Sequence, residues 1–359
     1  MPAANGPASG ATTSGGAAMY VLEKQGRFII PRTELTYPCH NLRMHENAAA
    51  TNADLVMADF EDACPYEFKG EPSRKVMVEA LNTVDFGNKV VTVRPNNIRS
   101  PFFLGDLEAV MLGAPDRFHG IILPKVYGPD DIRYVSRLLD ALEQQGGWKT
   151  RVQMEVLIET PQALLHAYEI ATASDRMVGL IFGIADFAAT LGVGEFGGDQ
   201  TNFLYAKQAV VVAAKAAGLH AIDCVYPDIV RRDTPPEEAE RIREGLRRKN
   251  QIAASVGMDG AWVIHPSQVD VVNEVFTPSD QEIERAKEAL EAYYRLGGGS
   301  MINPVTNEFE DEASAKIKLM VLAKGVQAGK VSADYLASMA EKSRAITGYD
   351  ILQTFRRLA

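Results

Sequence analysis

Eight short apolar runs recur along this chain, with amphipathic stretches between them. From the second run onward they return roughly every 27–40 residues, which is the repeat length of a (β/α)8 barrel. The chain has 359 residues, enough for such a barrel of about 250 residues and a further segment. The runs are Glu34–Pro38, Leu55–Phe60, Val90–Arg94, Gly120–Lys125, Gln153–Glu159, Gly179–Ala185, Ala221–Tyr226 and Ala261–Ile264.

The stretches between the runs carry apolar residues at helical spacing, as in Ile132, Val135 and Leu139. Apolar strands separated by helices indicate a parallel sheet that is covered on both faces. The competing fold is a doubly wound open sheet, but no G-x-G-x-x-G follows an early strand and eight repeats would be many for it. We therefore predict an α/β TIM barrel. Its predicted helices include Asp130–Gln144, Pro161–Thr172, Phe203–Ala217 and Pro235–Ser255.

We predict three regions in the chain. Residues 1–27 form a disordered tail, because Met1–Ala18 is rich in Gly, Ala, Ser and Thr and carries no charge. Residues 28–296 form the barrel, in which Phe28–Ile30 competes with Glu34–Pro38 for the place of the first strand. Residues 297–359 form a helical lid or arm, which begins at the glycine hinge Gly297–Gly299.

Composition limits the classes of partner. The formal net charge of −10 argues against a general nucleic-acid binder and against a protein of anionic membrane surfaces. No apolar run approaches the ~20 residues that cross a bilayer. The three cysteines (Cys39, Cys64 and Cys224) form no C-x-x-C motif, which fits a reducing cytoplasm. We predict a cytoplasmic protein without a nucleic-acid or membrane partner.

Two apolar runs end in an acid, Val156–Glu159 and Leu180–Asp186. Burying a lone carboxylate is costly, so an acid in this position calls for a partner. In a parallel sheet the two acids would converge at one end, where hard oxygen ligands suit Mg²⁺, with Mn²⁺ as an alternative. The other interpretation is a pair of helix-capping acids.

The remaining strand ends add charged residues to the same face of the barrel. Arg94 suits a substrate carboxylate, because its guanidinium offers two parallel N–H donors. Lys125 suits a Schiff base, a salt bridge to Glu61 or Asp62, or a phosphate contact. His265 is interpreted as pocket lining, and Arg43 as either a phosphate contact or part of a solvated helical turn. The predicted strand-end residues are Asp59, Glu61, Asp62, Arg94, Lys125, Glu159, Asp186, Asp228 and His265.

Six segments in order resemble the citrate-lyase β-subunit-like lyases, a family that includes malyl-CoA and citramalyl-CoA lyases. The resemblance covers about residues 34–320. The segments are Asp59-Phe60-Glu61-Asp62-Ala63, Val93-Arg94-Pro95-Asn96, Leu123-Pro124-Lys125-Val126, Leu157-Ile158-Glu159-Thr160, Gly183-Ile184-Ala185-Asp186 and Val263-Ile264-His265-Pro266.

This resemblance implies roles for individual residues. Glu159 and Asp186 would bind Mg²⁺, and Arg94 would bind the acyl or keto-acid part of the substrate. Ala185 with Asp186, and Ile264 with His265, would line the pocket. Asp311, in the segment Asn307–Ala313, would be a catalytic aspartate that a neighbouring subunit of a homo-oligomer, a trimer or hexamer, delivers.

The chain departs from the resemblance in its first βα loop. Asn41 and Asn47 stand where an arginine and a lysine commonly contact CoA in malyl-CoA lyases. Arg32 and Arg43 lie nearby in the sequence, so CoA would be held differently, or the acyl carrier would not be CoA.

The resulting hypothesis is a Mg²⁺-dependent retro-Claisen lyase acting on a 3-hydroxyacyl-CoA, with a CoA thioester and a small keto acid as its ligands. Arg94 would neutralise the developing negative charge, Asp311 would transfer the proton at the enolate carbon, and Asp59, Glu61 and Asp62 would orient metal-bound waters. Three alternatives stay open: a thioesterase or malate-synthase-like enzyme, a CoA-independent keto-acid aldolase, and a non-catalytic subunit of a lyase complex.

Overall fold

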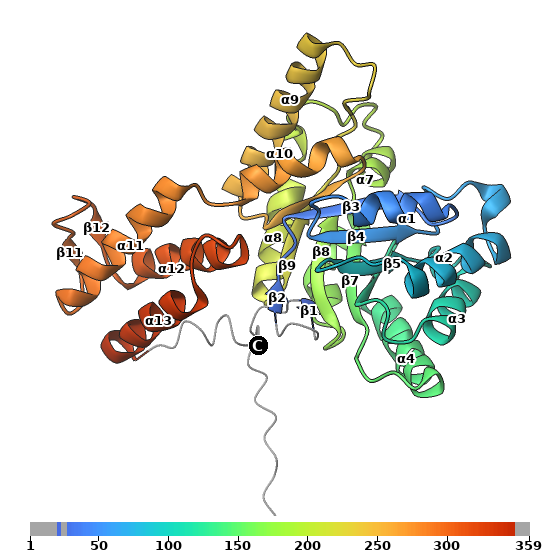
Figure 1. Cartoon of the computed structure of the whole chain (residues 1–359), viewed down its shortest axis with the longest axis horizontal. Helices are drawn as coiled ribbons and strands as arrows, with labels where there is room; N and C mark the ends of the chain where they lie inside the picture. Colours follow the sequence, from blue (N-terminus) through green and yellow to red (C-terminus); the bar gives the residue numbers. More distant parts are fainter. Residues whose placement is uncertain (1–19, 23–26, 349–359) are drawn as a thin grey trace, which may run out of the picture.

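Eight parallel strands close into a barrel with helices around it (Figure 1). The computed structural model describes residues 20–22 and 27–348. Around the barrel each strand pairs with its predecessor in the chain, and β10 closes the ring onto β3. The barrel strands are β3 (Thr33–Pro38), β4 (Leu55–Asp59), β5 (Val90–Arg94), β6 (Gly120–Leu123), β7 (Gln153–Ile158), β8 (Met177–Phe182), β9 (His220–Asp223) and β10 (Gly260–Val263).

The predicted strands are confirmed as the barrel, with differences at their ends. β5 has the predicted bounds, but β8 ends at Phe182 where we predicted Ala185. Gly183 is the N-cap of a helix that begins at Ile184, so the strand ends three residues before the apolar run ends. The competing first strand, Phe28–Ile30, lies outside the barrel: β2 (Arg27–Ile29) pairs antiparallel with β1 (Tyr20–Leu22).

The helices follow the predicted order. One difference lies at Pro161–Thr172, where the chain forms two short helices that meet at His166, with φ −106° and ψ 16°. The helices are α1 (Leu42–Ala49), α2 (Glu71–Thr83), α3 (Phe103–Gly113), α4 (Pro129–Gly146), α5 (Pro161–Leu165), α6 (Ala167–Ala171), α7 (Ile184–Leu191), α8 (Leu204–Ala216), α9 (Pro236–Ser255), α10 (Pro266–Phe276), α11 (Asp280–Arg295), α12 (Glu312–Gln327) and α13 (Ala333–Thr347). Short 3-10 turns cover Tyr66–Phe68 and Thr201–Phe203.

Two apolar layers hold the barrel together. A small cluster fills its interior and includes Leu55, Val90, Ile122, Leu157 and Ile222. A larger cluster lies between the outer faces of the strands and the surrounding helices. This arrangement explains why the strands read as nearly continuous apolar runs, since both of their faces are buried.

The C-terminal helices form a unit with a core of its own. Leu290, Leu319 and Met339 come from α11, α12 and α13 and are buried in one cluster. We predicted a domain boundary at residue 297, but α11 packs with this unit, so the boundary falls between α10 and α11. Gly297–Gly299 all have positive φ, and they form a turn inside the unit rather than the link to the barrel.

Between α11 and α12 the chain forms a small hairpin of β11 (Met301–Ile302) and β12 (Phe309–Glu310). This hairpin lies on the side of the unit away from the barrel (Figure 1). A side-chain bridge joins the unit to the barrel: the Gln327 amide donates to the Ile30 carbonyl oxygen at 2.5 Å and accepts from the Ile30 N–H at 3.3 Å.

The predicted tail, residues 1–27, lies outside the described residues except at its end. There Tyr20–Leu22 is a strand and not disordered chain. Among the described residues no helix has the length and apolar character that a membrane span requires.

Candidate active site

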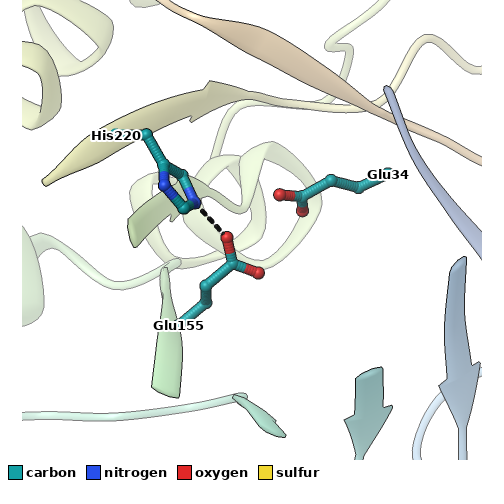
Figure 2. Close-up of side chains that lie close together, drawn as sticks. All are labelled: Glu34, Glu155 and His220. Atoms are coloured by element: carbon teal, nitrogen blue, oxygen red, sulfur yellow. Dashed lines mark hydrogen bonds and ion pairs between the residues drawn. The ribbon is translucent and has the colours of Figure 1, made fainter. Parts of the chain in front are cut away.

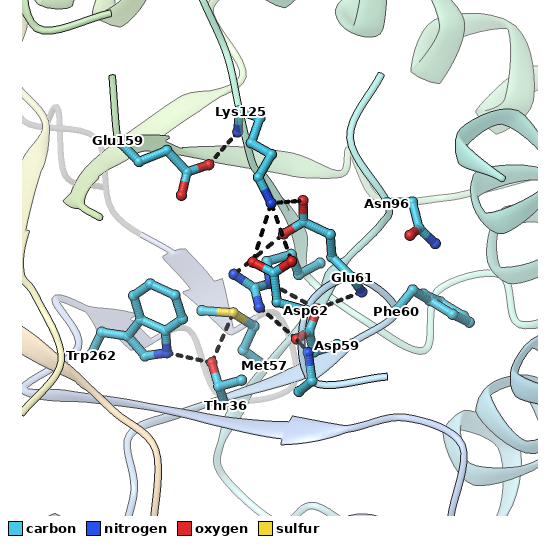
Figure 3. Close-up of polar contacts among 12 residues, drawn as sticks. Thr36, Met57, Asp59, Phe60, Glu61, Asp62, Asn96, Lys125, Glu159 and Trp262 are labelled. Atoms are coloured by element: carbon cyan, nitrogen blue, oxygen red, sulfur yellow. Dashed lines mark hydrogen bonds and ion pairs between the residues drawn. The ribbon is translucent and has the colours of Figure 1, made fainter. Parts of the chain in front are cut away.

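Four consecutive strands, β4 to β7, bring charged side chains to one end of the barrel (Figure 3), and a further acid follows β8. Asp59 and Arg94 are the last residues of β4 and β5, and Glu159 follows the last residue of β7. Lys125 follows β6 by two residues, and Asp186 lies in the first turn of α7 after β8. This is the carboxyl end of the strands, where the active sites of TIM barrels lie.

Arg94 is buried and held from three sides. Its Nε and Nη2 donate to the two oxygens of Asp59 at 2.7 and 2.5 Å, and its Nη1 lies 3.6 Å from Glu61 Oε2. Its guanidinium carbon lies 5.1 Å from the centre of the Trp262 ring, a cation–π contact. We predicted a two-pronged clamp for a substrate carboxylate, but Asp59 occupies that pair of donors. Only the edge that carries Nη1 is left for a ligand.

Asp59 is a positioning residue. Besides Arg94, its oxygens accept hydrogen bonds from the backbone N–H groups of Glu61 and Ala63, both at 2.8 Å. These contacts fix Arg94 and also the start of the loop after β4. The predicted role of Asp59 in orienting metal-bound waters does not fit, because both oxygens are already engaged. Glu61 and Asp62, in contrast, point their carboxylates toward Lys125 (Figure 3).

Lys125 forms the salt bridge to Glu61 and Asp62 that was one of its predicted roles. Its Nζ lies 2.6 Å from Glu61 and 3.2 Å from Asp62. Burial alone would lower the pKa of Lys125, but the hydrogen bond and charge of Glu61, with Asp62 and Asp186 nearby, raise it above its ordinary value. An ammonium held in this way is a poor nucleophile, so the geometry argues against the Schiff base.

The backbone of Lys125 has a second function. Its φ of +52° places a non-glycine residue in the left-handed region, a conformation that costs energy and often marks a functional site. In this conformation its N–H donates to Glu159 Oε1. The strained residue therefore fixes the carboxylate that follows β7.

Glu159 is a buried acid with too few cations around it. Burial, followed by the charges of Glu61 and Asp186, raises its pKa to about 8. The pKa of Glu61 is raised to about 7, chiefly by burial. Among the described residues, the cations that interact with these acids are Arg94 and Lys125. Five acids, Asp59, Glu61, Asp62, Glu159 and Asp186, against these two cations leave an excess of three negative charges when all are ionised. A divalent cation would relieve this excess, and carboxylate oxygens are the ligands that Mg²⁺ prefers.

The glycine before α7 lets Glu159 approach β8. A Cβ at Gly183 would lie 2.5 Å from Glu159 Cβ and 3.0 Å from Oε2, closer than packed atoms come. Asp186, in the first turn of α7 and three residues after Gly183, is half-buried, and Ala185 beside it is exposed. The charge of Asp186 contributes to the raised pKa of Glu159, so the two acids lie near each other.

The other predicted residues lie at the rim. Ile264 is exposed, and His265 caps α10 by accepting from the Ser267 N–H at 3.2 Å. Arg43 is exposed on α1, and the Asn41 side chain caps that helix by accepting from the Arg43 N–H at 3.0 Å. The cap contact orders His265 at the start of α10, and its role in lining a pocket stays a prediction. The hydrogen bond from Arg43 gives Asn41 a structural role of its own.

Sequence reasoning missed the residues that hold the loop after β4. Lys69 donates to the carbonyl oxygens of Phe60 and Glu61 at 2.9 and 2.7 Å, and to Asn96 Oδ1 at 2.6 Å. Asn96 in turn donates to Asp106 at 2.7 Å. Asn96 ends the segment Val93–Asn96, but the sequence assigns it no role, and nothing in the sequence around Lys69 marks that residue.

Asp311 is the N-cap of α12 and lies in the C-terminal unit. Its Oδ1 accepts from the Ser314 N–H at 2.8 Å, and its own N–H donates to Ser314 Oγ at 2.9 Å. The hairpin just before it lies far from the barrel of its own chain (Figure 1). Within one chain, therefore, the structure does not bring Asp311 together with Glu159.

Comparison with known proteins identifies the family of the chain. The HpcH/HpaI aldolase/citrate lyase family matches residues 32–266. The L-malyl-CoA/beta-methylmalyl-CoA lyase of Cereibacter sphaeroides is 34% identical over 290 residues, which cover 76% of this chain and 87% of the relative. The citrate lyase subunit beta of Leuconostoc mesenteroides is 31% identical and covers 73% of this chain and 82% of its own length.

Solved structures lead to the same family. The protein CitE from Mycobacterium tuberculosis, crystallised with magnesium, acetoacetate and coenzyme A, is similar with a TM-score of 0.65 and 25% identity, over 82% of this chain and 98% of that one. A citrate lyase from Burkholderia xenovorans shares the fold, with a TM-score of 0.71 and 20% identity over 88% and 98% of the two chains. The chain is therefore an enzyme of the HpcH/HpaI aldolase/citrate lyase family.

Proposed function

We propose that this enzyme is a Mg²⁺-dependent lyase that cleaves or forms a 3-hydroxyacyl-CoA such as malyl-CoA, β-methylmalyl-CoA or citramalyl-CoA. The products of cleavage would be acetyl-CoA or propionyl-CoA and glyoxylate or pyruvate. The observation that carries the proposal is Glu159, a buried carboxylate whose pKa is raised to about 8 among further acids at the carboxyl end of the barrel. The lyases among its relatives and a neighbour that binds magnesium and coenzyme A support it.

Glu159 and Asp186 would hold the ion. Bound Mg²⁺ would supply Lewis-acid polarisation of the hydroxyl and carboxylate oxygens of the substrate. The carboxylate of Glu159 accepts a hydrogen bond from the Lys125 N–H, and its side chain packs against Gly183. Its position is therefore fixed before any ligand binds. Glu61 and Asp62, held by Lys125, would accept hydrogen bonds from waters at the ion.

Arg94 would bind the keto-acid end of the substrate. With two of its donors engaged by Asp59, it offers the edge that carries Nη1 to a carboxylate or to the oxygen on which charge develops. Asp59 and Trp262 keep that edge in place. Because the guanidinium is held in place before the reaction, it does not have to reorient as charge develops, and this lowers the barrier.

Asp311 would transfer the proton at the carbon of the thioester enolate, in a neighbouring subunit. The hairpin before it exposes Ile302 and Phe309, which are 62% and 60% accessible, together with Val305. Apolar side chains so exposed on a small hairpin favour a protein surface as their neighbour. A homo-oligomer in which each unit of α11–α13 covers the next barrel would satisfy both the hairpin and the active site.

The proposed activity is tested by incubating the protein and Mg²⁺ with malyl-CoA, β-methylmalyl-CoA and citramalyl-CoA, and identifying the products by mass spectrometry. A lyase releases keto acid and acyl-CoA in equal amounts. Release of free CoA would indicate a thioesterase, and turnover of the free hydroxy acids would indicate a CoA-independent aldolase.

The exchange of Asp311 between subunits is tested by complementation. Asp311→Asn should bind Mg²⁺ and substrate but lose turnover, because an amide does not transfer the proton. Mixing it with Glu159→Ala subunits, under conditions that allow exchange, should restore part of the activity. Loss of turnover without complementation would instead place Asp311 on its own barrel.

A further inference from the structure

Three polar side chains meet inside the barrel at the end opposite to the active site (Figure 2). Glu34, Glu155 and His220 come from the beginnings of β3, β7 and β9, and each is at most 1% accessible. Glu155 precedes Glu159, the residue after the end of β7, by four residues of nearly extended chain, which separates their Cα atoms by about 13 Å. The cluster is therefore not part of the active site.

The fold makes room for this cluster. Glu155 and His220 lie on β7 and β9, and their common neighbour on β8 is Gly179. A Cβ at Gly179 would lie 2.2 Å from His220 Nε2 and 2.8 Å from Glu155 Oε1. A residue with a side chain at this position would exclude the pair, so the glycine keeps open a space that the two polar groups fill.

Glu34 is buried without a hydrogen-bond donor in the part of the chain that the structure describes. Neither of its oxygens accepts a hydrogen bond within the described residues, and the same holds for Glu155 Oε2. Both carboxylates are enclosed by the apolar interior cluster, which includes Leu55, Val90 and Ile222. Burying two carboxylates in such a place costs several kcal/mol for each unless a positive charge accompanies them.

We infer that Glu34, Glu155 and His220 hold a divalent first-row transition ion, Zn²⁺ or Mn²⁺, as a structural site separate from the active site. An imidazole nitrogen with two carboxylates suits these ions, whereas Mg²⁺ prefers oxygen ligands alone. An ion of charge +2 neutralises the two carboxylates and takes up the oxygens of Glu34 that lack a donor.

The geometry needs only small movements. One ligand atom from each residue lies within 4.8 Å of the others. Ligands around one Zn²⁺ lie about 3.3 Å apart. Side-chain rotations that move the ligand atoms by up to about 1.5 Å would therefore place them at coordination distance from one ion. The Glu34 carboxylate already points toward the contact between His220 Nε2 and Glu155 Oε1 (Figure 2).

The competing arrangement is a proton-sharing network. Burial and the nearby Glu155 charge raise the pKa of Glu34 well above its ordinary value, so a protonated Glu34 could donate to Glu155. With a protonated His220 this network is also neutral. The two arrangements respond differently to Glu34→Gln, because a glutamine amide can replace the protonated carboxyl as a donor but is a poor metal ligand.

The test is the metal content of the full-length protein after expression with Zn²⁺ and Mn²⁺ and dialysis against EDTA. An ion enclosed in the barrel is released only by unfolding, unlike Mg²⁺ at the open end. We expect about one transition ion per chain in the wild type, in Glu159→Gln and in the exposed control Glu46→Gln, and less than about a tenth of that in Glu34→Gln and Glu155→Gln.

A second measurement covers variants that fail to fold. Unfolding the dialysed wild type in guanidinium with a chromogenic chelator should release the same single ion, and diffraction at the zinc edge should place it between the three side chains. A wild type that carries no ion after this expression would overturn the inference and leave the proton-sharing network. An ion kept equally by Glu34→Gln would place the metal elsewhere.

Discussion

Replacing Glu159 by glutamine should stabilise the metal-free enzyme in alkaline solution. Glu159 has a folded-state pKa of about 8 against an ordinary value of 4.5. Between these two values the folded protein binds more protons at this group than the unfolded chain does. Its contribution to the free energy of unfolding is therefore full below pH 4.5 and is lost as the pH rises toward 8.

The loss attributable to Glu159 alone is about 2 kcal/mol between pH 6 and pH 8, because each pH unit in this window is worth slightly more than about 1 kcal/mol. Glutamine does not titrate, so Glu159→Gln lacks this slope. Other groups, Glu61 among them, titrate in both proteins. The difference between wild type and variant isolates the one carboxylate.

The assay is urea unfolding in EDTA, followed by tryptophan fluorescence. Both tryptophans, Trp148 and Trp262, belong to the barrel and not to the C-terminal unit, so the signal reports on barrel unfolding. The variant should gain about 2 kcal/mol relative to the wild type between pH 6 and pH 8. Glu46→Gln, an exposed acid on α1, should follow the wild type.

Adding Mg²⁺ should stabilise the wild type more than the variant. At about one hundred times its dissociation constant, the ion stabilises a protein by about 3 kcal/mol, and only the wild type has the complete site. Parallel pH curves for wild type and Glu159→Gln would refute the buried-charge argument. An equal response of both proteins to Mg²⁺ would remove Glu159 from the metal site.

Three further substitutions test other parts of the account. Arg94→Lys should lower kcat/KM by at least about 100-fold and destabilise the barrel by about 3 kcal/mol, because an ammonium cannot occupy both oxygens of Asp59 and stack on Trp262; steady-state kinetics and unfolding with near-normal values would contradict this. Lys69→Met should lower kcat while changing the free energy of unfolding little, since it frees the loop that carries Glu61 and Asp62. Hydrogen exchange in residues 60–69 at the wild-type rate would argue against this. Leu319→Ala should destabilise the C-terminal unit by about 2–5 kcal/mol and leave the Mg²⁺ affinity of the barrel unchanged. A parallel loss of Mg²⁺ binding, measured by calorimetry, would show that the two cores are coupled.

The barrel was predictable because its strands are buried on both faces. The apolar run at Val90–Arg94 ends where β5 ends, since the charge of Arg94 marks the edge of the sheet. At β8 the apolar run continues into α7, because Ile184 at the start of that helix is buried too, and periodicity does not separate the end of a buried strand from a buried residue of the following helix. Gly297–Gly299 resembled a domain link, whereas the core between α11 and α12 depends on tertiary contacts.

The candidate site was predictable where charge interrupts an apolar run, and not where partners come from distant segments. Glu159 and Asp186 follow such runs. The engagement of Arg94 by Asp59 depends on their pairing across β4 and β5, which the sequence does not specify residue by residue. Glu34 and His220 stand at the beginnings of their strands, where a polar residue reads as an ordinary strand boundary.

The central claim is that Glu159 makes carbon–carbon bond cleavage depend on Mg²⁺. The most direct measurement is keto acid released from malyl-CoA or citramalyl-CoA by wild type and Glu159→Gln, in EDTA and after titration with Mg²⁺. We expect no release in EDTA, full recovery in the wild type with equal amounts of keto acid and acyl-CoA, and no recovery in the variant. Keto acid release by the wild type in excess EDTA, or by Glu159→Gln with Mg²⁺, would contradict the account.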